Sequence, residues 1–194
     1  RDGRPHSGPF AILLAHPLMG TASGKGERIA AESYANAACM PIRLVLDNVR
    51  SGQNVGACFR SGDAFRIEGL DLCGITCHPP HRDILKSALG SSGHVPWRPW
   101  DNTLDAVMFL QEEGWKVAAV EQADDSTWLH EWQPASNDKW ALVLGNEVRG
   151  VSQEVLDLCD AVLEMPQYGV KQSINLSVCA GVVLWQAALH LRHA

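Results

Sequence analysis

Three short polar segments of the chain carry residue types that could bind a ligand or take part in chemistry. They lie at residues 47–60, 145–150 and 165–177, and each follows a short apolar run and leads toward a helical pattern. Open α/β sheets bind their ligands where strands end and helices begin. The three segments are therefore candidates for a functional site.

The first segment contains Asn54, Gly56 and Arg60 at the start of a helical pattern. We predict that Asn54 caps the N-terminus of this helix, and a helix N-terminus attracts anions. Gly56 would let a backbone or a ligand approach closely. Taken singly, Asn54 could be a purely structural cap and Arg60 an ordinary solvated charge on a helix.

The second and third segments add an acid and a group of small polar side chains. Two glycines bracket Glu147 directly after an apolar run, and a plain tight turn would explain the glycines but not the acid. Ser173, Asn175 and Ser177 precede the last helical pattern. A helix needs only one N-cap, so the surplus of polar side chains indicates a second task.

Familiar nucleotide-binding and hydrolase motifs are absent from the sequence. Residues 20–26 resemble a phosphate-binding loop, but they are one residue short and lack the Ser or Thr that should follow the lysine. No G-x-G-x-x-G follows a predicted strand, and no Ser lies in a G-x-S-x-G turn. Kinase, dehydrogenase and hydrolase functions are therefore disfavoured.

A possible zinc set consists of Cys73, Cys77, His78 and His81. Zinc does bind such ligands. The cysteines, however, lie in a strand-like run, where alternate side chains point to opposite faces, and two prolines then interrupt the chain. We therefore favour a structural role for these residues and expect no metal.

The elements that would position the three segments alternate between strands and helices. Short apolar runs predict strands at residues 10–15, 42–46, 70–77, 116–120, 140–144 and 161–164. Helical patterns cover residues 24–38, 55–67, 82–89, 103–113, 152–158 and about 175–192. The runs show little polar alternation, which is typical of strands buried on both faces. This order predicts an α/β fold with a mostly parallel sheet.

The composition restricts the class of protein. A chain of 194 residues with 46% apolar and 20% charged residues suits one large globular domain. No apolar stretch is long enough to span a bilayer and no secretory signal stands at the start, so we expect a cytoplasmic protein. The six scattered cysteines are then expected to be buried free thiols.

The charge is unevenly distributed along the chain. The net charge is −6, which argues against an indiscriminate nucleic-acid binder. Residues 1–100 hold 11 basic and 8 acidic residues, whereas residues 101–194 hold 5 and 14. A phosphate-facing surface should therefore come from the first half. Its basic candidates are Arg43, Arg50, Arg66, Arg82 and Lys86, although an ordinary surface charge is the favoured interpretation of each one singly.

Taken together, the three segments resemble the motifs of the SPOUT methyltransferases of the TrmH (SpoU) branch. Residues 54–60 (NVGACFR) match N-x-G-x-x-x-R, and residues 144–150 (LGNEVRG) match L-G-x-E-x-x-G. Met165-Pro166 and residues 173–178 (SINLSV) match I-P…S-L-N-V-S-V, with Ile174 in place of Leu. The resemblance covers about residues 42–191.

The resemblance implies an RNA 2′-O-ribose methyltransferase that uses S-adenosyl-L-methionine and acts on tRNA or rRNA as a homodimer. It implies an α/β domain whose C-terminal segment forms a deep trefoil knot. Residues 42–194 would be this domain, and residues 1–41 an N-terminal extension or an extra βα unit. The donor would be held near Gly145, Met165 and Ile174. The implied catalytic residues are Asn54, Arg60, Glu147, Ser173 and Asn175.

The chemistry suggests what these residues would do. A guanidinium has a pKa above roughly 12 and is a poor base, so we favour Arg60 as a clamp on the target phosphate and the developing alkoxide. Glu147 could brace Arg60 or the loop, and Ser173 and Asn175 could orient the donor or the ribose through hydrogen bonds. The last helix presents apolar residues, including Trp185, that we expect at the dimer interface.

Two alternatives remain open. One is a catalytically inactive RNA-binding dimer, which the intact catalytic set disfavours. The other is a related SPOUT enzyme that methylates a base nitrogen, and the Ser173-Ile174-Asn175 motif favours ribose by resemblance only. Four tryptophans could stack on RNA bases, although packing in loops or at a dimer contact is favoured for them: Trp97, Trp100, Trp128 and Trp132.

Overall fold

Seven parallel strands form one sheet in the computed structural model, which describes residues 29–171 and 173–191. The order across the sheet is β3-β2-β1-β6-β4-β7-β5. The strands are β1 (Met40–Asp47), β2 (Ile67–Cys73), β3 (Trp97–Trp100), β4 (Lys116–Val120), β5 (Thr127–Trp128), β6 (Trp140–Leu144) and β7 (Ala161–Glu164). All pairings are parallel, which confirms the predicted α/β class.

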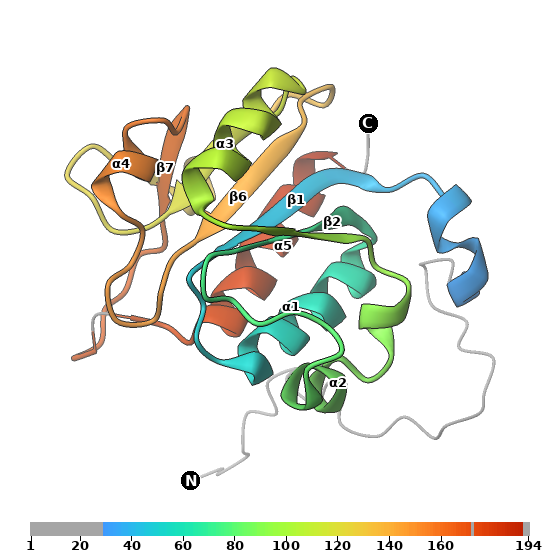
Figure 1. Ribbon diagram of the computed structural model, residues 1–194. Coiled ribbons are helices and arrows are strands. Elements are labelled where there is room, and N and C mark those ends of the chain that lie inside the picture. Colours follow the sequence, from blue (N-terminus) through green and yellow to red (C-terminus); the bar gives the residue numbers. More distant parts are fainter. Residues whose placement is uncertain (1–28, 172, 192–194) are drawn as a thin grey trace, which may run out of the picture.

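Helices cover both faces of the sheet (Figure 1). On one face lie α1 (Gly52–Phe65), α2 (Arg82–Ala88) and α5 (Leu176–Leu191), with α5 packed beside α1. On the other face lie α3 (Thr103–Glu112) and α4 (Gln153–Leu156). Three 3₁₀ helices complete the described elements: η1 (Ala31–Asn36), η2 (Ser91–Gly93) and η3 (Leu129–Glu131).

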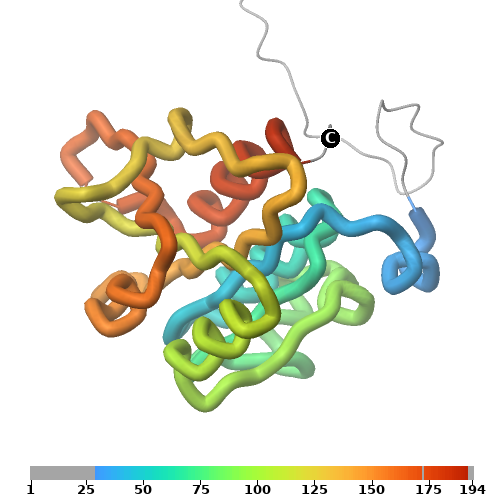
Figure 2. Tube along the Cα trace, turned by 90° about the horizontal axis from the view of Figure 1, so that it is seen from above, coloured from blue at the N-terminus to red at the C-terminus, as the bar shows by residue number. Residues whose placement is uncertain are grey.

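The two halves of the chain lie side by side (Figure 2). Strands β1 to β3 come from the first half and the other four from the second, and the halves join where β1 pairs with β6. The central strands carry apolar residues toward both layers, so one core cluster lies under α1 and α5 and another under α3 and α4. The continuous apolar runs in the sequence follow from this double burial.

Most predicted elements agree with the structure. Strands β4, β6 and β7 have the predicted bounds, and the predicted helices beyond residue 50 agree within a few residues. The run at 70–77 was extended too far, because the chain leaves the sheet at Gly74, whose φ is +61°, and Ile75 is exposed. The prediction of a strand at residues 10–15 lies outside the described residues.

The predicted helix at 24–38 is wrong for its described part. Residues 31–36 form the short 3₁₀ helix η1, and no side chain caps its N-terminus at Ala30. Its anchor is Tyr34, which is 2% exposed and donates a hydrogen bond to the Ile67 carbonyl at 2.9 Å. The segment is therefore fixed by one buried tyrosine rather than by helical propensity.

The edge strands β3 and β5 were not predicted from the sequence. Strand β3 has the sequence WRPW, in which Pro99 cannot donate to a ladder and normally indicates a turn. An edge position tolerates proline, because one side of the strand has no partner. Strand β5 is only two residues long and too short for any periodic signal.

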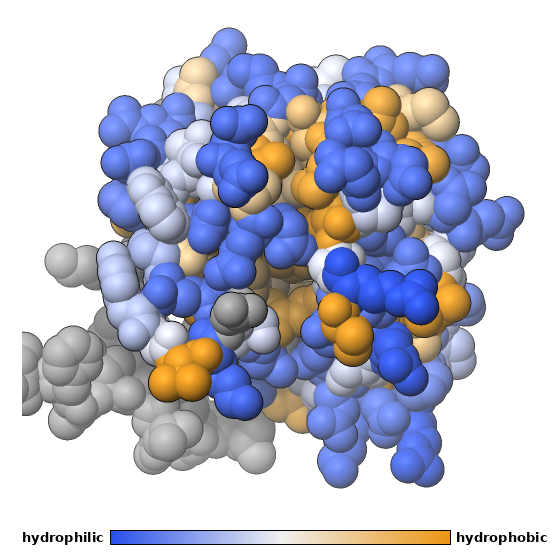
Figure 3. Space-filling model, turned by 90° about the vertical axis from the view of Figure 1, so that its left-hand side faces the viewer, coloured by the Kyte–Doolittle hydropathy of each residue, from blue (hydrophilic) through white to orange (hydrophobic). Residues whose placement is uncertain are grey.

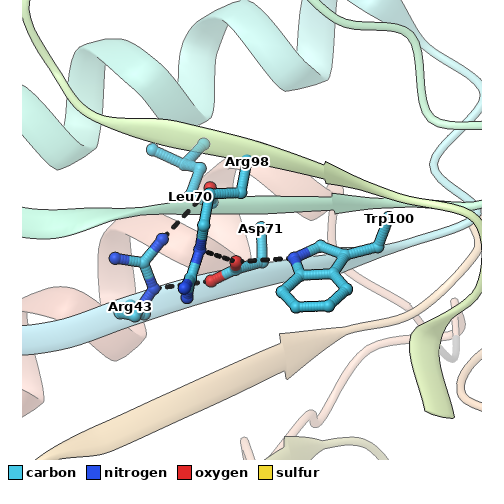
Figure 4. A network of polar contacts seen from close by, with 5 residues as sticks. All are labelled: Arg43, Leu70, Asp71, Arg98 and Trp100. Carbon is cyan, nitrogen blue, oxygen red and sulfur yellow. Dashed lines mark hydrogen bonds and ion pairs between the residues drawn. The ribbon is translucent and has the colours of Figure 1, made fainter. Parts of the chain in front are cut away.

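A buried ionic network lies where β1, β2 and β3 meet (Figure 4). Asp71 is fully buried and accepts hydrogen bonds from Arg43 Nε at 2.6 Å, Arg98 Nε at 3.0 Å and Trp100 Nε1 at 2.8 Å. The interpretation of Arg43 as a phosphate ligand or surface charge is therefore wrong, because its side chain is buried against Asp71.

Candidate functional site

The three candidate segments meet at the carboxyl end of the sheet. The first segment follows β1, the second follows β6 and the third follows β7. Because β1 and β6 are neighbours, residues after them lie in contact: Asn146 Nδ2 donates to the Asn48 carbonyl at 2.7 Å. The packing of α5 beside α1 brings the third segment to the first.

Glu147 joins the second segment to the first. Its carboxylate accepts hydrogen bonds from the Arg50 N–H at 3.1 Å and the Ser51 N–H at 3.2 Å. It also accepts one from Asn54 Nδ2 at 3.1 Å. Glu147 therefore braces the loop that leads into α1, which is one of the two roles considered for it, and no hydrogen bond or ion pair joins it to Arg60 among the described residues.

These hydrogen bonds favour the ionised form of Glu147. Partial burial on its own would raise the pKa of the carboxyl group. The hydrogen bonds from the Arg50 and Ser51 N–H groups and from the Asn54 amide outweigh that effect and lower the pKa below its ordinary value. Glu147 is thus an anionic acceptor at neutral pH and is not set up as a general acid.

Asn54 also links to the third segment. Asn175 Nδ2 donates to Asn54 Oδ1 at 3.2 Å, and Asn175 Oδ1 accepts from the Ser177 N–H at 2.9 Å. Asn175 therefore caps α5, and its amide still reaches Asn54. One hydrogen-bonded chain, Glu147–Asn54–Asn175, connects all three segments.

The prediction that Asn54 is the N-cap of α1 is wrong. The cap is Ser51, whose Oγ accepts from the Asn54 N–H at 3.2 Å. Asn54 is in the first helical turn, where its backbone N–H needs an acceptor while its side chain is free to face the other two segments. Ser, like Asn, is a preferred residue type at an N-cap, so the sequence alone could not decide between Ser51 and Asn54.

A pocket of about 680 Å³ opens beside this hydrogen-bonded chain. It lies at the ends of β6, β4 and β7, and its volume suits a drug-sized ligand. Figure 3 looks onto this side of the molecule and shows apolar surface inside a hollow surrounded by hydrophilic residues. The predicted site residues that line the pocket are Gly145, Glu147, Met165, Ser173, Ile174 and Asn175.

Gly145 is required by the turn after β6. A Cβ at this position would lie 2.3 Å from the Gly150 carbonyl carbon and 2.4 Å from the Val151 nitrogen, so no side chain fits. The turn is closed by the two backbone hydrogen bonds between Asn146 and Gly150, at 2.9 and 3.1 Å. The glycine thus allows a tight turn whose backbone forms one wall of the pocket.

Arg60 lies apart from the pocket. It is exposed on α1, about two helical turns beyond Asn54, and it does not line the cavity. Within residues 29–171 and 173–191 its guanidinium makes no hydrogen bond or ion pair. Ser173 is also exposed, but it lies at the pocket wall.

Two pocket residues were missed in the sequence. Glu121 is the first residue after β4, and it lines the pocket between the second and third segments. Asn146 shapes the turn, since its Oδ1 accepts from the N–H groups of Val148 and Arg149. A polar residue directly after an apolar strand was the available signal for Glu121, as it was for Glu147.

The tryptophans mostly pack against other rings. Trp132 is 6% exposed and meets Trp140 edge to face at 5.4 Å. Trp97 stacks on His78, and Trp100 lies against Phe109. Trp128 is 42% exposed and lines a smaller pocket of about 340 Å³. Packing, the favoured interpretation, is therefore confirmed for Trp97, Trp100 and Trp132.

Cysteine and metal chemistry have little support in the described residues. The six cysteines are free, as predicted, although only Cys58 and Cys73 are fully buried. Burial raises the pKa of the Cys58 thiol to about 12, so it stays protonated at neutral pH. No group of three or more His, Cys, Asp or Glu side chains within 29–171 and 173–191 is arranged to hold a metal ion. No helix of that part could span a membrane.

Comparison with known families gives one clear similarity. Residues 41–185 match the model of the SpoU rRNA Methylase family. An uncharacterized tRNA/rRNA methyltransferase of Archaeoglobus fulgidus is 33% identical over 143 residues, which cover 73% of this chain and 62% of the relative. The 23S rRNA (guanosine-2′-O-)-methyltransferase RlmB of Escherichia coli K12 is 30% identical over 148 residues, 76% of this chain and 59% of the relative. The chain thus spans about three fifths of these curated relatives.

Solved structures give the same similarity. An AdoMet-bound rRNA methyltransferase from Sinorhizobium meliloti superposes with a TM-score of 0.72 at 29% identity, covering 77% of this chain and 56% of the other. The TrmH/SpoU tRNA modifying enzyme of A. aeolicus gives a TM-score of 0.68 at 26% identity, covering 76% of this chain and 74% of the other.

Proposed function

Because the chain belongs to the SpoU rRNA methylase family, we propose that it transfers a methyl group from S-adenosyl-L-methionine to a ribose 2′-hydroxyl of tRNA or rRNA in the cytoplasm. The observation that carries this proposal is the convergence of the three segments on one pocket. The relatives named as tRNA or rRNA methyltransferases support the choice of RNA.

The pocket fits the proposed donor. Adenosine needs apolar walls, backbone polar groups at its edge and close approach, and these are supplied by Met165, Ile174 and the backbone at Gly145. A side chain at Gly145 would collide with the turn that forms the pocket wall. When bound, S-adenosylmethionine would supply an electrophilic methyl group. The residues of this chain would hold that group in line with the target oxygen.

We assign the Glu147–Asn54–Asn175 chain to positioning rather than to proton transfer. Glu147 is held ionised by hydrogen bonds it accepts from the loop before α1 and from Asn54, so its role is to fix that loop to the pocket. Asn175 and Ser173 line the pocket, where they would orient the ribose or the donor by hydrogen bonding.

Arg60 would act across a subunit interface. Val178, Val182, Trp185 and Leu189 form an exposed apolar stripe on α5, with Trp185 59% exposed. We propose that this stripe pairs two chains as a homodimer. Since α1 packs beside α5 in one layer and Arg60 is an exposed residue of α1, we propose that a second chain on α5 lies beside Arg60. Arg60 would then clamp the target phosphate over the partner's pocket.

The domain division also stays a proposal. We propose that residues 42–194 form the methyltransferase domain and that residues 1–41 extend it at the N-terminal side. The C-terminal trefoil knot implied by the family resemblance stays a prediction as well.

Calorimetric titration of the purified chain with S-adenosylmethionine and S-adenosylhomocysteine tests the proposal. We expect both compounds to bind the wild type, and binding to be lost in Ile174→Arg, which fills the pocket from a partly exposed position and should fold. A folded wild type that binds neither compound would overturn the proposal. Binding of the donor without transfer to RNA would instead favour the inactive RNA-binding dimer.

A further inference from the structure

We infer that Glu121 binds the ribose hydroxyls of the methyl donor, an inference that rests on the proposed function and adds a specificity residue to it. Glu121 follows β4 directly, and β4 lies between β6 and β7 in the sheet. Glu121 therefore lines the pocket between the turn that holds Gly145 and the segment that begins at Met165.

The Glu121 carboxylate is fixed in place. Oε2 accepts a hydrogen bond from the Val151 N–H at 3.0 Å, and Oε1 accepts one from the Gln122 N–H at 3.0 Å. Oε2 also lies 2.2 Å from where a Cβ of Gly150 would be, so the acid packs tightly against the turn. Burial first and the charge of Glu121 second raise the pKa of Cys179 on α5, which lines the same pocket.

This arrangement leaves free acceptor positions on both carboxylate oxygens of a residue that lines the pocket. A carboxylate has about four acceptor positions, and the two backbone N–H groups use one on each oxygen. The charged side chains among the described lining residues are Glu121, Glu147 and Arg149, and Glu147 is directed to the loop before α1. Glu121 is thus the free anionic acceptor of the pocket. A ribose offers two neighbouring hydroxyl donors, which match two free acceptor positions.

The ribose is a better partner for this acid than the cationic sulfur. A carboxylate beside the sulfonium would stabilise a positive charge that disappears during transfer, which would slow the reaction. The ribose hydroxyls, in contrast, are unchanged by methyl transfer. The adenine is expected at Gly145 and Ile174, and the attached ribose then falls near the strand between the two segments.

The experiment measures how much each ribose hydroxyl contributes to binding, with and without Glu121. The ligands are S-adenosylmethionine, S-adenosylhomocysteine and the 2′-deoxy and 3′-deoxy analogues of S-adenosylhomocysteine. They are titrated by calorimetry into the wild type, Glu121→Gln and Glu121→Ala. The control variant is Glu112→Gln, an exposed acid on α3. Thermal melting verifies that each variant is folded. Glu121→Ala is included because the amide NH₂ of a glutamine would face one of the two backbone N–H groups, which is also a donor, and alanine avoids this conflict.

In the wild type and in Glu112→Gln, loss of a hydroxyl should weaken binding on the order of 10-fold, as for other hydrogen bonds to charged groups. In the Glu121 variants, loss of the same hydroxyl should weaken binding by about twofold or less. An equal penalty with and without Glu121 would overturn this inference alone. A variant that loses affinity for S-adenosylmethionine but not for S-adenosylhomocysteine would show that Glu121 faces the sulfonium and would also overturn it. A wild type that binds neither compound would overturn the proposed function itself.

Discussion

At the scale of single residues, the site depends on side chains that fix backbone segments rather than on groups poised for proton transfer. Glu147 accepts from two backbone N–H groups and one amide, and Asn175 both caps α5 and reaches Asn54. Such positioning can account for much of the catalysis in an in-line methyl transfer, where alignment of donor and acceptor dominates. Arg60, an exposed cation of the first motif that lies outside the pocket, is the residue that we propose acts on the RNA.

Loss of Arg60 should damage turnover far more than donor binding. Arg60 lies outside the pocket, so Arg60→Ala should leave donor affinity near that of the wild type. Removal of one positioned donor to developing negative charge should lower the single-turnover rate on the order of 10²–10³-fold. Arg60→Lys should restore little, because an ammonium cannot reproduce a two-pronged guanidinium contact.

Paired measurements of single-turnover methylation and donor titration check this prediction. A near wild-type rate in Arg60→Ala would mean that Arg60 is only a surface charge. A loss of donor binding would instead mean that Arg60 contributes to the donor pocket or to the stability of the fold. Either result would be incompatible with the proposed clamp.

Glu147 should stabilise the fold only while it is ionised. Its pKa in the folded chain lies below the ordinary value of 4.5, so its contribution is complete above pH 4.5 and is lost as the pH falls through the lower folded value. The melting temperature of the wild type should therefore exceed that of Glu147→Gln at pH 7, and the difference should shrink below pH 4.5. A difference that stays constant down to pH 3 would argue against this linkage, with Glu112→Gln as the control.

At the scale of elements, the parallel strands bring together residues that are almost a hundred positions apart. The register of β1 on β6 places residues after Leu46 beside those after Leu144, and this pairing positions Glu147 against Arg50 and Ser51. The β1–β2–β3 side of the sheet is held by the buried Asp71 network, so the geometry of the first segment depends on that network too.

Asp71→Ala should destabilise the chain strongly. It leaves Arg43, 8% exposed, as a buried cation without its carboxylate, and breaking a buried pair typically costs about 3–5 kcal/mol. Arg98→Ala should cost much less, because the Arg98 side chain is 38% exposed and its loss leaves Arg43 paired with Asp71. Urea denaturation measures both effects. A smaller loss for Asp71→Ala than for Arg98→Ala would contradict this account of the network.

The fold could be predicted to the extent that burial left a pattern in the sequence. Strand β6 is buried throughout and β4 at its centre, whereas in β7 only Leu163 is fully buried. The apolar runs of all three strands predict their bounds without error. Strand β3 contains Pro99 and lies at the edge, so its local sequence resembled a loop. The cap of α1 was misplaced because both Ser51 and Asn54 are good caps, and only tertiary contacts decide between them.

The candidate site was predictable as far as its residues lie at strand ends. Six of the eight predicted residues line the pocket, and Asn54 bonds to two of them, Glu147 and Asn175. Glu121 belongs to no motif, so its place directly after an apolar strand was the one signal in the sequence for it. The sequence could not show that Arg60 lies away from the pocket, since its spacing from Asn54 places it on the same helix but not on the same face.

At the scale of the whole molecule, the account requires a second chain. The apolar stripe on α5 runs along a helix that already buries its other side on the sheet, so the stripe is surplus to the needs of one domain. A twofold pairing through this stripe would place the Arg60 of each chain near the pocket of the other.

Sedimentation should show a dimer of the 21.1 kDa chain at micromolar concentration, and Trp185→Asp should convert it to a monomer. Leu85→Asp, on the exposed side of α2, should remain dimeric. An equimolar mixture of Arg60→Ala and Ile174→Arg should recover about a quarter of the wild-type activity. About half of the dimers would be mixed, and each mixed dimer would combine one intact pocket with the partner's Arg60, which is one working site of two. A wild type that sediments only as a monomer, or mixed dimers without activity, would contradict the shared site.

The central claim, methylation of an RNA ribose, is tested most directly by mass spectrometry of nucleosides from tRNA and rRNA of cells that lack the gene. We predict that one 2′-O-methylated nucleoside is lost and that it returns with the wild-type gene but not with Arg60→Ala. An unchanged set of 2′-O-methylated nucleosides, or the loss of a base-methylated nucleoside instead, would contradict the account.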